Sequence, residues 1–247
     1  MTTQYRTSPV CGKAKRHYTP SSKMADLLCD HYCIFLLIFN FDIKLGMGEK
    51  TIKEVCQEYN IDVDTFIYLV HFLLWGDLAN HHATGGVPQK LDIPLLIKFL
   101  KRSHSYFLEY RLPQIRTRIL DVLSTTSQDV EFVIKRYFDE YAEEVNQHMS
   151  YENNVVFPYV ENLLKGEASP SYAIQIFEQK HDQVELKMLE LKNILIKYYT
   201  GGDPLRMNNA LHELYTCGDE LYIHNAIEDL IFIPCIKEIE ESARKSK

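Results

Sequence analysis

The sequence predicts an all-α protein, in which a small helical N-terminal domain precedes an up-down-up-down four-helix bundle. Three observations lead to this prediction. Long amphipathic helical patterns fill residues 92–245, only short breaks separate them, and no stretch alternates apolar and polar residues as a strand would. Short connections place long consecutive helices antiparallel to one another, which is the arrangement of such a bundle.

The composition is that of an ordinary globular protein and excludes several classes. Hydrophobic residues make up 46% of the 247 residues. The net charge of −7 argues against nucleic acid or an anionic membrane surface as the main partner. No apolar run approaches the ~20 residues of a transmembrane helix. Because the six cysteines form no CxxC pair and no signal-peptide pattern is visible, we expect reduced thiols and a cytoplasmic location.

Composition divides the chain into four parts. Residues 1–23 are basic and polar and contain no acidic residue, so we expect a flexible tail. Residues 24–80 carry apolar helical patterns and form the predicted small domain. Residues 81–91 contain two glycines and a proline and form the predicted linker. Residues 92–245 form the predicted bundle.

The small domain is expected to contain three helices. Leu27 to Phe41 is apolar enough for one buried helix. Thr51 and Glu54 have the spacing of a capping box at the start of a second helix. Asp62 is the expected cap of a third helix.

The bundle is expected to contain four long helices. Each ends at a short stretch rich in residues that break helices, such as Gly166 or the pair Gly201-Gly202. The predicted helices span about 92–123, 127–165, 169–200 and 204–245.

One spacing of charged residues occurs twice in the bundle. The two copies are Glu144, His148, Glu152 and Pro158, and Glu220, His224, Glu228 and Pro234. Residues four apart share one face of a helix, so each copy directs a histidine and a glutamate toward the same neighbour. Two such helices facing each other would bring two imidazoles and two carboxylates to one point.

Every predicted bundle helix carries one histidine on its core-facing side. Antiparallel helices bring their midpoints level, so these side chains can meet. The six predicted metal ligands are His104, His148, Glu152, His181, His224 and Glu228. Two carboxylates would repel each other in a dry core, whereas two divalent ions would be held by terminal imidazoles and bridging carboxylates. Nitrogen and oxygen ligands without thiolate suit Fe, Mn or Zn.

These residues make the bundle resemble the hemerythrin-like (HHE) family, and most closely the repair-of-iron-centres proteins of the ScdA/YtfE type. The resemblance is carried by His104 with Leu112-Pro113, by His148 with Glu152 and Phe157-Pro158, by His181-Asp182, and by His224 with Glu228. It implies a non-haem centre of two Fe ions, bridged by Glu152, Glu228 and an oxo or hydroxo group. It also implies reaction with O2 or NO under oxidative or nitrosative stress and a role in the repair of damaged iron–sulfur proteins.

Two further parts of the chain bear on this resemblance. Glu144 and Glu220 precede a ligand histidine by one turn and would orient imidazole N–H groups or relay protons or ions; surface glutamates are the alternative. Residues 24–80 resemble the family's N-terminal module in Phe41-Asp42-Ile43 and Thr51-Ile52-Lys53-Glu54-Val55-Cys56. However, Gly46 and Met47 stand where that module has a Cys-Cys pair.

Three functions are compatible with these observations. The first is a stress-response di-iron protein that handles NO or O2 and supports iron–sulfur proteins. The alternative is a hemerythrin-like module that binds O2 or NO reversibly, or senses iron, without turnover. The third is a metal-free structural bundle. No catalytic residue is assigned, and a homodimer stays an open question.

Overall fold

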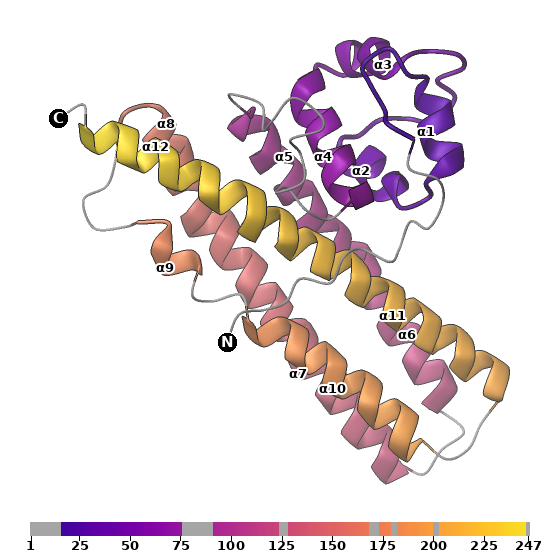
Figure 1. The fold of residues 1–247 in the computed structure, drawn as a ribbon. Helices are drawn as coiled ribbons and strands as arrows, with labels where there is room; N and C mark the ends of the chain where they lie inside the picture. The colour runs from indigo at the N-terminus through magenta and orange to yellow at the C-terminus, as the bar shows by residue number, and fades with distance from the viewer. Residues whose placement is uncertain are drawn as a thin grey trace. The chain divides into compact units, whose positions relative to one another are not determined.

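The computed structural model describes residues 16–75, 91–123, 128–167, 173–178, 182–199 and 203–245 (Figure 1). The chain divides into two compact units, Met1–Arg102 and Ser103–Lys247, which are described separately. Over the described ranges every regular element is a helix, and the one β-type contact is an isolated antiparallel bridge between Lys23 and Thr51. The all-α prediction is therefore confirmed. None of the described helices is both long and apolar enough to cross a bilayer.

The first unit contains four short helices and most of a fifth. They are α1 (Met24–Asp30), α2 (Ile34–Asn40), α3 (Ile52–Glu58), α4 (Val63–Trp75) and α5 (Ile93–Ser105), within which the division between the units falls. The expected single helix from Leu27 to Phe41 is wrong, because the chain leaves the helix at His31. This residue has an extended backbone with a φ of −140°, and its buried ring packs edge-on against Tyr18.

The predicted helix starts in this unit are confirmed. The Thr51 hydroxyl accepts a hydrogen bond from the Glu54 backbone N–H at 3.2 Å, and the Glu54 carboxylate accepts one from the Thr51 N–H at 2.7 Å. This reciprocal pair is the capping box read from the sequence. The Asp62 carboxylate likewise accepts from the Thr65 N–H at 2.8 Å at the start of α4.

Residues 16–23 belong with the packed part of the chain rather than with the tail that their composition predicts. The Tyr18 side chain is fully buried, and its hydroxyl donates to Asp30 at 2.7 Å. The Tyr18 carbonyl lies 2.9 Å from Nε2 of His71 on α4. The remainder of the expected tail, and the expected linker apart from Leu91, lie outside the described residues.

The cysteines differ from the expectation at one position. Cys33 is disulfide-bonded, so the expectation of reduced thiols is wrong there. Cys29, Cys56, Cys217 and Cys235 are free thiols.

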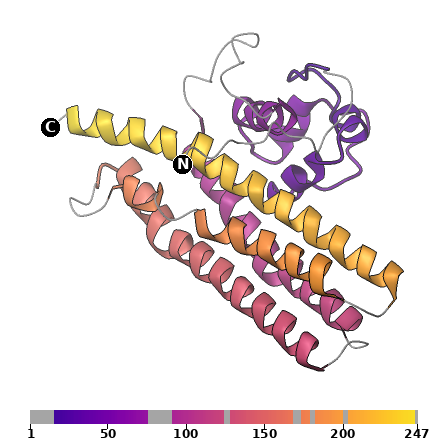
Figure 2. The ribbon, with the colours of Figure 1, turned by 60° about the horizontal axis from the view of Figure 1, so that its bottom comes forward.

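The second unit is built from the long helices of the bundle. Besides the end of α5, these are η2 (Tyr106–Arg111), α6 (Leu112–Leu123), α7 (Gln128–Tyr151), η3 (Glu152–Val156), α8 (Phe157–Leu164), α9 (Gln175–Glu178), α10 (Asp182–Tyr198), α11 (Pro204–Ile227), η4 (Glu228–Phe232) and α12 (Ile233–Lys245). Helices α6 and α10 each pack against both α7 and α11, which closes a ring of four helices (Figures 1 and 2). The four-helix bundle is thus confirmed.

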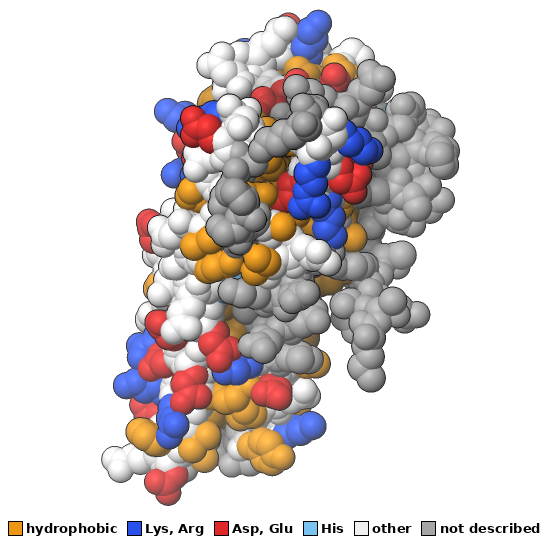
Figure 3. Space-filling model, turned by 90° about the vertical axis from the view of Figure 1, so that its left-hand side faces the viewer, with side chains coloured by type: hydrophobic (Ala, Val, Ile, Leu, Met, Phe, Trp, Pro, Cys, Tyr) orange, Lys and Arg blue, Asp and Glu red, His pale blue; other side chains and the backbone are white. Residues whose placement is uncertain are grey.

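The core of the bundle is aromatic and aliphatic. Buried side chains such as Ile119, Phe138, Tyr141, Leu191 and Leu214 come from all four helices of the ring. On the face shown in Figure 3, acidic and basic side chains are interspersed. Exposed ion pairs of this kind each stabilise a protein by about 0–1 kcal/mol, so the buried apolar side chains contribute more to the stability of the bundle.

Three of the long helices contain a π turn, which the sequence analysis did not anticipate. Leu112, Phe157 and Ile233 each donate their backbone N–H to the carbonyl five residues earlier, at Phe107, Glu152 and Glu228. A proline follows each donor, as Pro113, Pro158 and Pro234. Because proline has no N–H, it cannot donate the next α-helical bond, and a π turn lets the helix continue past it.

The π turns shift the side-chain register of the helices that follow. On an uninterrupted α-helix Val155 would share the face of His148 and Glu152, but it is exposed and Val156 is fully buried instead. The same shift buries Val160 and Ile236, while Ile231 inside η4 stays buried. One residue is inserted into each turn, so the core positions that follow the turn move by one.

Candidate metal centre

Four buried side chains meet inside the second unit. They are His104 near the end of α5, Glu152 at the start of η3, His224 on α11 and Glu228 at the start of η4. Each offers one potential ligand atom, and these atoms all lie within 4.8 Å of one another. Three helical segments, α5, η3 and the continuous α11–η4, therefore contribute to one cluster.

The carboxylates lie between imidazoles from different helices. Nε2 of His104 is 2.8 Å from Oε2 of Glu152 and 4.0 Å from Oε1 of Glu228. On α11, Nε2 of His224 is 3.5 Å from Oε2 of Glu228. Both carboxyl groups have no exposure to solvent.

His148 lies beside this cluster. Its Nε2 is 2.8 Å from Oε1 of Glu152, the oxygen that does not face His104. The His148 side chain is 10% exposed, whereas the His224 side chain is 2% exposed. Of the six predicted ligands, His181 lies outside the described residues. The other five lie together, with three imidazoles around the two glutamates.

The π turns help to position the two glutamates. Glu152 and Glu228 are the first residues of η3 and η4, and each accepts the wide hydrogen bond of its turn through its own carbonyl. Single π turns in long helices occur often at functional sites because they re-aim side chains without breaking the helix. The Pro158 and Pro234 of the repeated spacing are the signal in the sequence that could have revealed them.

Phenylalanine rings surround the imidazoles. Phe157 stacks on His104 with ring centroids 5.6 Å apart, and Phe107 packs edge-on against His224 at 5.8 Å. Phe177 stacks on His148 at 6.3 Å. These three aromatic side chains are almost completely buried. They give the site an apolar wall in which electrostatic interactions are strong.

The hydrogen bonding of His104 tests whether a cation fits this cluster. Its Nδ1 lies 3.0 Å from the amide oxygen of Asn153, which can only accept, so Nδ1 carries the proton. In the neutral ring, the lone pair of Nε2 then faces the Glu152 carboxylate. Two lone pairs at 2.8 Å repel, unless a proton or a metal ion lies between them. The donor set therefore fits a bound metal ion.

Thiolate does not take part in this donor set. Cys217 is fully buried on α11, and burial raises its pKa to about 12. Cys217 is also not among the four side chains whose potential ligand atoms meet, so the described cluster offers nitrogen and oxygen atoms alone.

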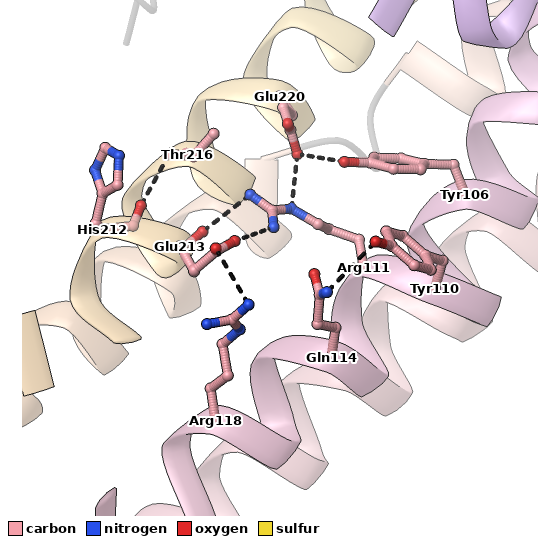
Figure 4. A network of polar contacts seen from close by, with 9 residues as sticks. All are labelled: Tyr106, Tyr110, Arg111, Gln114, Arg118, His212, Glu213, Thr216 and Glu220. Atoms are coloured by element: carbon pink, nitrogen blue, oxygen red, sulfur yellow. Dashed lines mark hydrogen bonds and ion pairs between the residues drawn. The ribbon is translucent and has the colours of Figure 1, made fainter. Parts of the chain in front are cut away.

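The two glutamates one turn before the ligand histidines lie in different surroundings. Glu144 forms an ion pair with Lys187 and is 37% exposed. Glu220 accepts from Nε of Arg111 at 3.0 Å and from the Tyr106 hydroxyl at 3.1 Å (Figure 4). Burial raises the pKa of Glu220, while the Arg111 guanidinium opposes that rise. Within the described part of the chain, neither carboxylate is hydrogen-bonded to a ligand imidazole.

Arg111 is the centre of a buried network that the sequence analysis did not find. Its side chain is almost fully buried and donates to the carboxylates of Glu213 and Glu220, which lie two turns apart on α11 (Figure 4). It also donates to the Glu213 carbonyl at 3.3 Å. This contact connects η2, which begins two residues after His104, to the helix that carries His224.

The first unit lacks the thiol pair of the resembling module. Gly46 has a φ of +91° in the loop where that pair would lie. An L-residue such as cysteine would be strained in this conformation, because its Cβ clashes with the backbone at positive φ. The backbone conformation at position 46 therefore disfavours cysteine.

Comparison with known families agrees with the cluster. The model of the hemerythrin HHE cation-binding domain matches residues 95–236, which is more than half of the chain and includes every predicted ligand. Among curated proteins, none matches this sequence. With its helical bundle and its buried His/Glu cluster, the chain belongs to the hemerythrin HHE cation-binding domain family.

Proposed function

We propose that the protein holds two Fe ions in this cluster and reacts with NO or O2 under nitrosative or oxidative stress. The observation that carries the proposal is the placement of Glu152. One of its oxygens lies 2.8 Å from His104 and the other lies 2.8 Å from His148. A carboxylate between two imidazoles from different helices is arranged to bridge two metal ions.

Glu228 supports the same arrangement. Its two oxygens lie toward His104 and His224, at 4.0 Å and 3.5 Å. Two bridging carboxylates with terminal imidazoles are typical of dinuclear sites in helical bundles. Donors of nitrogen and oxygen suit Fe and Mn, and the family resemblance favours Fe.

The histidine and glutamate side chains would bind the Fe ions and hold them in position. The surrounding aromatic side chains would shield them from solvent. The Fe ions would supply an open coordination position and the electrons for reaction with the diatomic ligand. The phenylalanine rings would exclude bulk water from the cluster. His148 is the most exposed of the five described ligands, so we propose that small ligands enter on its side.

Support for the repair of iron–sulfur proteins is the finer part of this proposal. Gly46 and Met47 stand where the family's module has its thiol pair, so the bundle would supply any iron delivered to such partners. The apolar wall around the site equally favours reversible binding of O2 or NO without turnover. In reversible binding, O2 or NO leaves the site unchanged. In the stress-response function, O2 or NO is consumed by the reaction.

The test is the metal content per chain of protein grown in iron-rich medium, with optical spectra before and after exposure to NO and O2. We expect two Fe per chain and a spectrum that changes with NO. Recovery of the starting spectrum when the ligand is removed would identify reversible binding, and consumption of the ligand would identify turnover. No iron, or a single zinc, would contradict the proposal.

A further inference from the structure

The ring of His104 is held on both sides by consecutive residues of η3. Oε2 of Glu152 lies 2.8 Å from Nε2, and Oδ1 of Asn153 lies 3.0 Å from Nδ1. Within the described residues, Asn153 is the hydrogen-bond partner that the structure gives to Nδ1. The other neighbours of the ring are His224, edge-on at 5.0 Å, and Phe157, stacked at 5.6 Å.

We propose that Asn153 is the positioning residue that fixes His104 in the Nδ1–H tautomer and directs Nε2 toward the metal. This inference rests on the proposed function, since it assigns Nε2 to a metal ion. An imidazole ligates through the nitrogen that carries no proton, and a hydrogen bond at the other nitrogen decides which one that is. In the orientation of the structure, the amide oxygen of Asn153 faces Nδ1, and because this oxygen can only accept, it selects the tautomer with a proton on Nδ1.

The π turn explains how neighbouring residues can reach the same ring. In an α-helix, consecutive side chains are about 100° apart, so a residue next to a core ligand points away from the site. A π turn has more residues in each turn, and the angle between consecutive side chains is smaller. Glu152 and Asn153 begin η3, and Asn153 is half-buried while the next residue, Asn154, is exposed.

The amide also sets how strongly His104 donates to a metal ion. A carboxylate at this position would pull the Nδ1 proton and make the ring a stronger donor, whereas an amide leaves the imidazole neutral. Asn153 therefore orients His104 without withdrawing the proton from Nδ1.

The experiment compares Asn153→Ala with Asn153→Asp and with the matched control Asn154→Ala, which alters the same π turn on its exposed side. Two measurements are made: the His104 tautomer by ¹⁵N NMR on the metal-free protein, and the affinity for ferrous iron by anaerobic competition with a chelator. We expect Asn153→Ala to lose the single tautomer and to weaken iron binding by roughly 10- to 100-fold. Asn153→Asp should keep the tautomer, and Asn154→Ala should behave as the wild type.

The two readouts separate this inference from the proposed function. If the wild-type protein binds no iron, the proposed function fails, while the tautomer measurement still tests the role of Asn153. If Asn153→Ala keeps the Nδ1–H tautomer, or binds iron as tightly as Asn154→Ala does, Asn153 is not the positioning residue. Should Asn153→Ala fail to fold, a loss of the tautomer in Asn153→Asp would overturn the inference in the same way.

Discussion

The two copies of the repeated spacing, residues 144–158 and 220–234, have the same backbone geometry but different surroundings. In both copies the second glutamate is fully buried and begins a π turn. In both, the residue before the proline donates to the carbonyl of that glutamate. The spacing thus determines the local geometry of Glu152 and Glu228, and the two positions are equivalent.

The first glutamate and the histidine of each copy are not equivalent. Glu144 pairs with Lys187 of α10 and is 37% exposed, whereas Glu220 pairs with the buried Arg111 and is 20% exposed. His148 is likewise more exposed than His224. Equal spacing produces an equal backbone, but the neighbouring helices decide burial. The first copy forms the accessible side of the site, and the second forms its buried side.

The equivalence of the two second glutamates predicts the largest effects. We expect Glu152→Gln and Glu228→Gln each to weaken iron binding by on the order of 100-fold or more, because a neutral amide cannot balance the charge of the metal. The metal-free forms of both variants should be at least as stable as the metal-free wild type, since one of two neighbouring buried carboxylates is neutralised. Chelator competition and thermal unfolding with and without iron measure the two quantities.

Glu143→Gln is the matched control for these variants. Glu143 is exposed on α7 and accepts a hydrogen bond from the exposed side chain of Gln147, so its replacement should change neither quantity. If one of the two variants, Glu152→Gln or Glu228→Gln, keeps full iron affinity while the other loses it, Glu152 and Glu228 are not equivalent. A large loss of stability in the metal-free proteins would identify the carboxylates as ion-pair partners rather than ligands.

The difference between the first glutamates predicts the next largest effect. Arg111→Met should lower the free energy of unfolding of the metal-free protein by about 2 kcal/mol, between the values for exposed and for buried pairs, because Glu220 loses its cation whereas Glu213 keeps Arg118 at 3.8 Å. Lys187→Met should lower it by about 0–1 kcal/mol, because the pair with Glu144 is well exposed. Chemical denaturation at pH 7 measures both. Equal losses would contradict the contrast between the two copies.

The loss in Arg111→Met should also depend on pH. Burial raises the pKa of Glu220 above its ordinary value of 4.5, and the groups around it are Arg111, Tyr106, Glu213 and Cys217. Without Arg111 the rise should be larger, so the folded variant takes up a proton that the unfolded chain does not hold. Its stability is then recovered as the pH falls through the raised pKa toward 4.5. A loss that is constant between pH 7 and 4.5 would indicate that Glu220 stays charged.

Much of the site could be predicted from the sequence, because ligand spacing on a helix depends on local geometry alone. The four-residue interval puts His148 and Glu152, or His224 and Glu228, on one face, whatever the rest of the chain does. The bounds of the first, second and fourth long helices follow from their amphipathic pattern and from breaks such as that at Gly166, whereas the expected start of the third at residue 169 is wrong, because the chain is not yet helical at Ala173 and Ile174. These features need no knowledge of which helices are neighbours.

The remainder depends on contacts between helices and on hydrogen bonds that no local pattern contains. Arg111 and Glu220 lie 109 residues apart in the chain, and His104 and Asn153 lie 49 apart. The prolines were visible in the sequence, but a proline in a helix indicates a kink, a break or a π turn equally well. For this reason the sequence alone does not indicate that Val156, rather than Val155, is the buried residue.

The smallest predicted effect concerns these prolines. Pro158→Ala and Pro234→Ala each restore a backbone N–H that can donate to the carbonyl four residues earlier, at Asn154 or Leu230. The new bond favours the α-helical register by about 1 kcal/mol and would draw the glutamate out of the cluster. We expect iron affinity to fall roughly fivefold in both copies, since 1.4 kcal/mol corresponds to about tenfold. Hydrogen exchange at the amides of Phe157 and Ile233 reports whether the π turn persists.

Pro113→Ala is the control, because it alters the π turn η2, which carries none of the predicted ligands. Pro113 and Pro234 are both exposed, so neither replacement removes a buried contact. If the π turns act by aiming Glu152 and Glu228, Pro113→Ala leaves iron affinity unchanged, while its helix loses the π hydrogen bond from Leu112 to Phe107. If all three variants weaken iron binding alike, the π turns act through the packing of the bundle as a whole, and the shared backbone of the two copies would not be what positions the metal ligands.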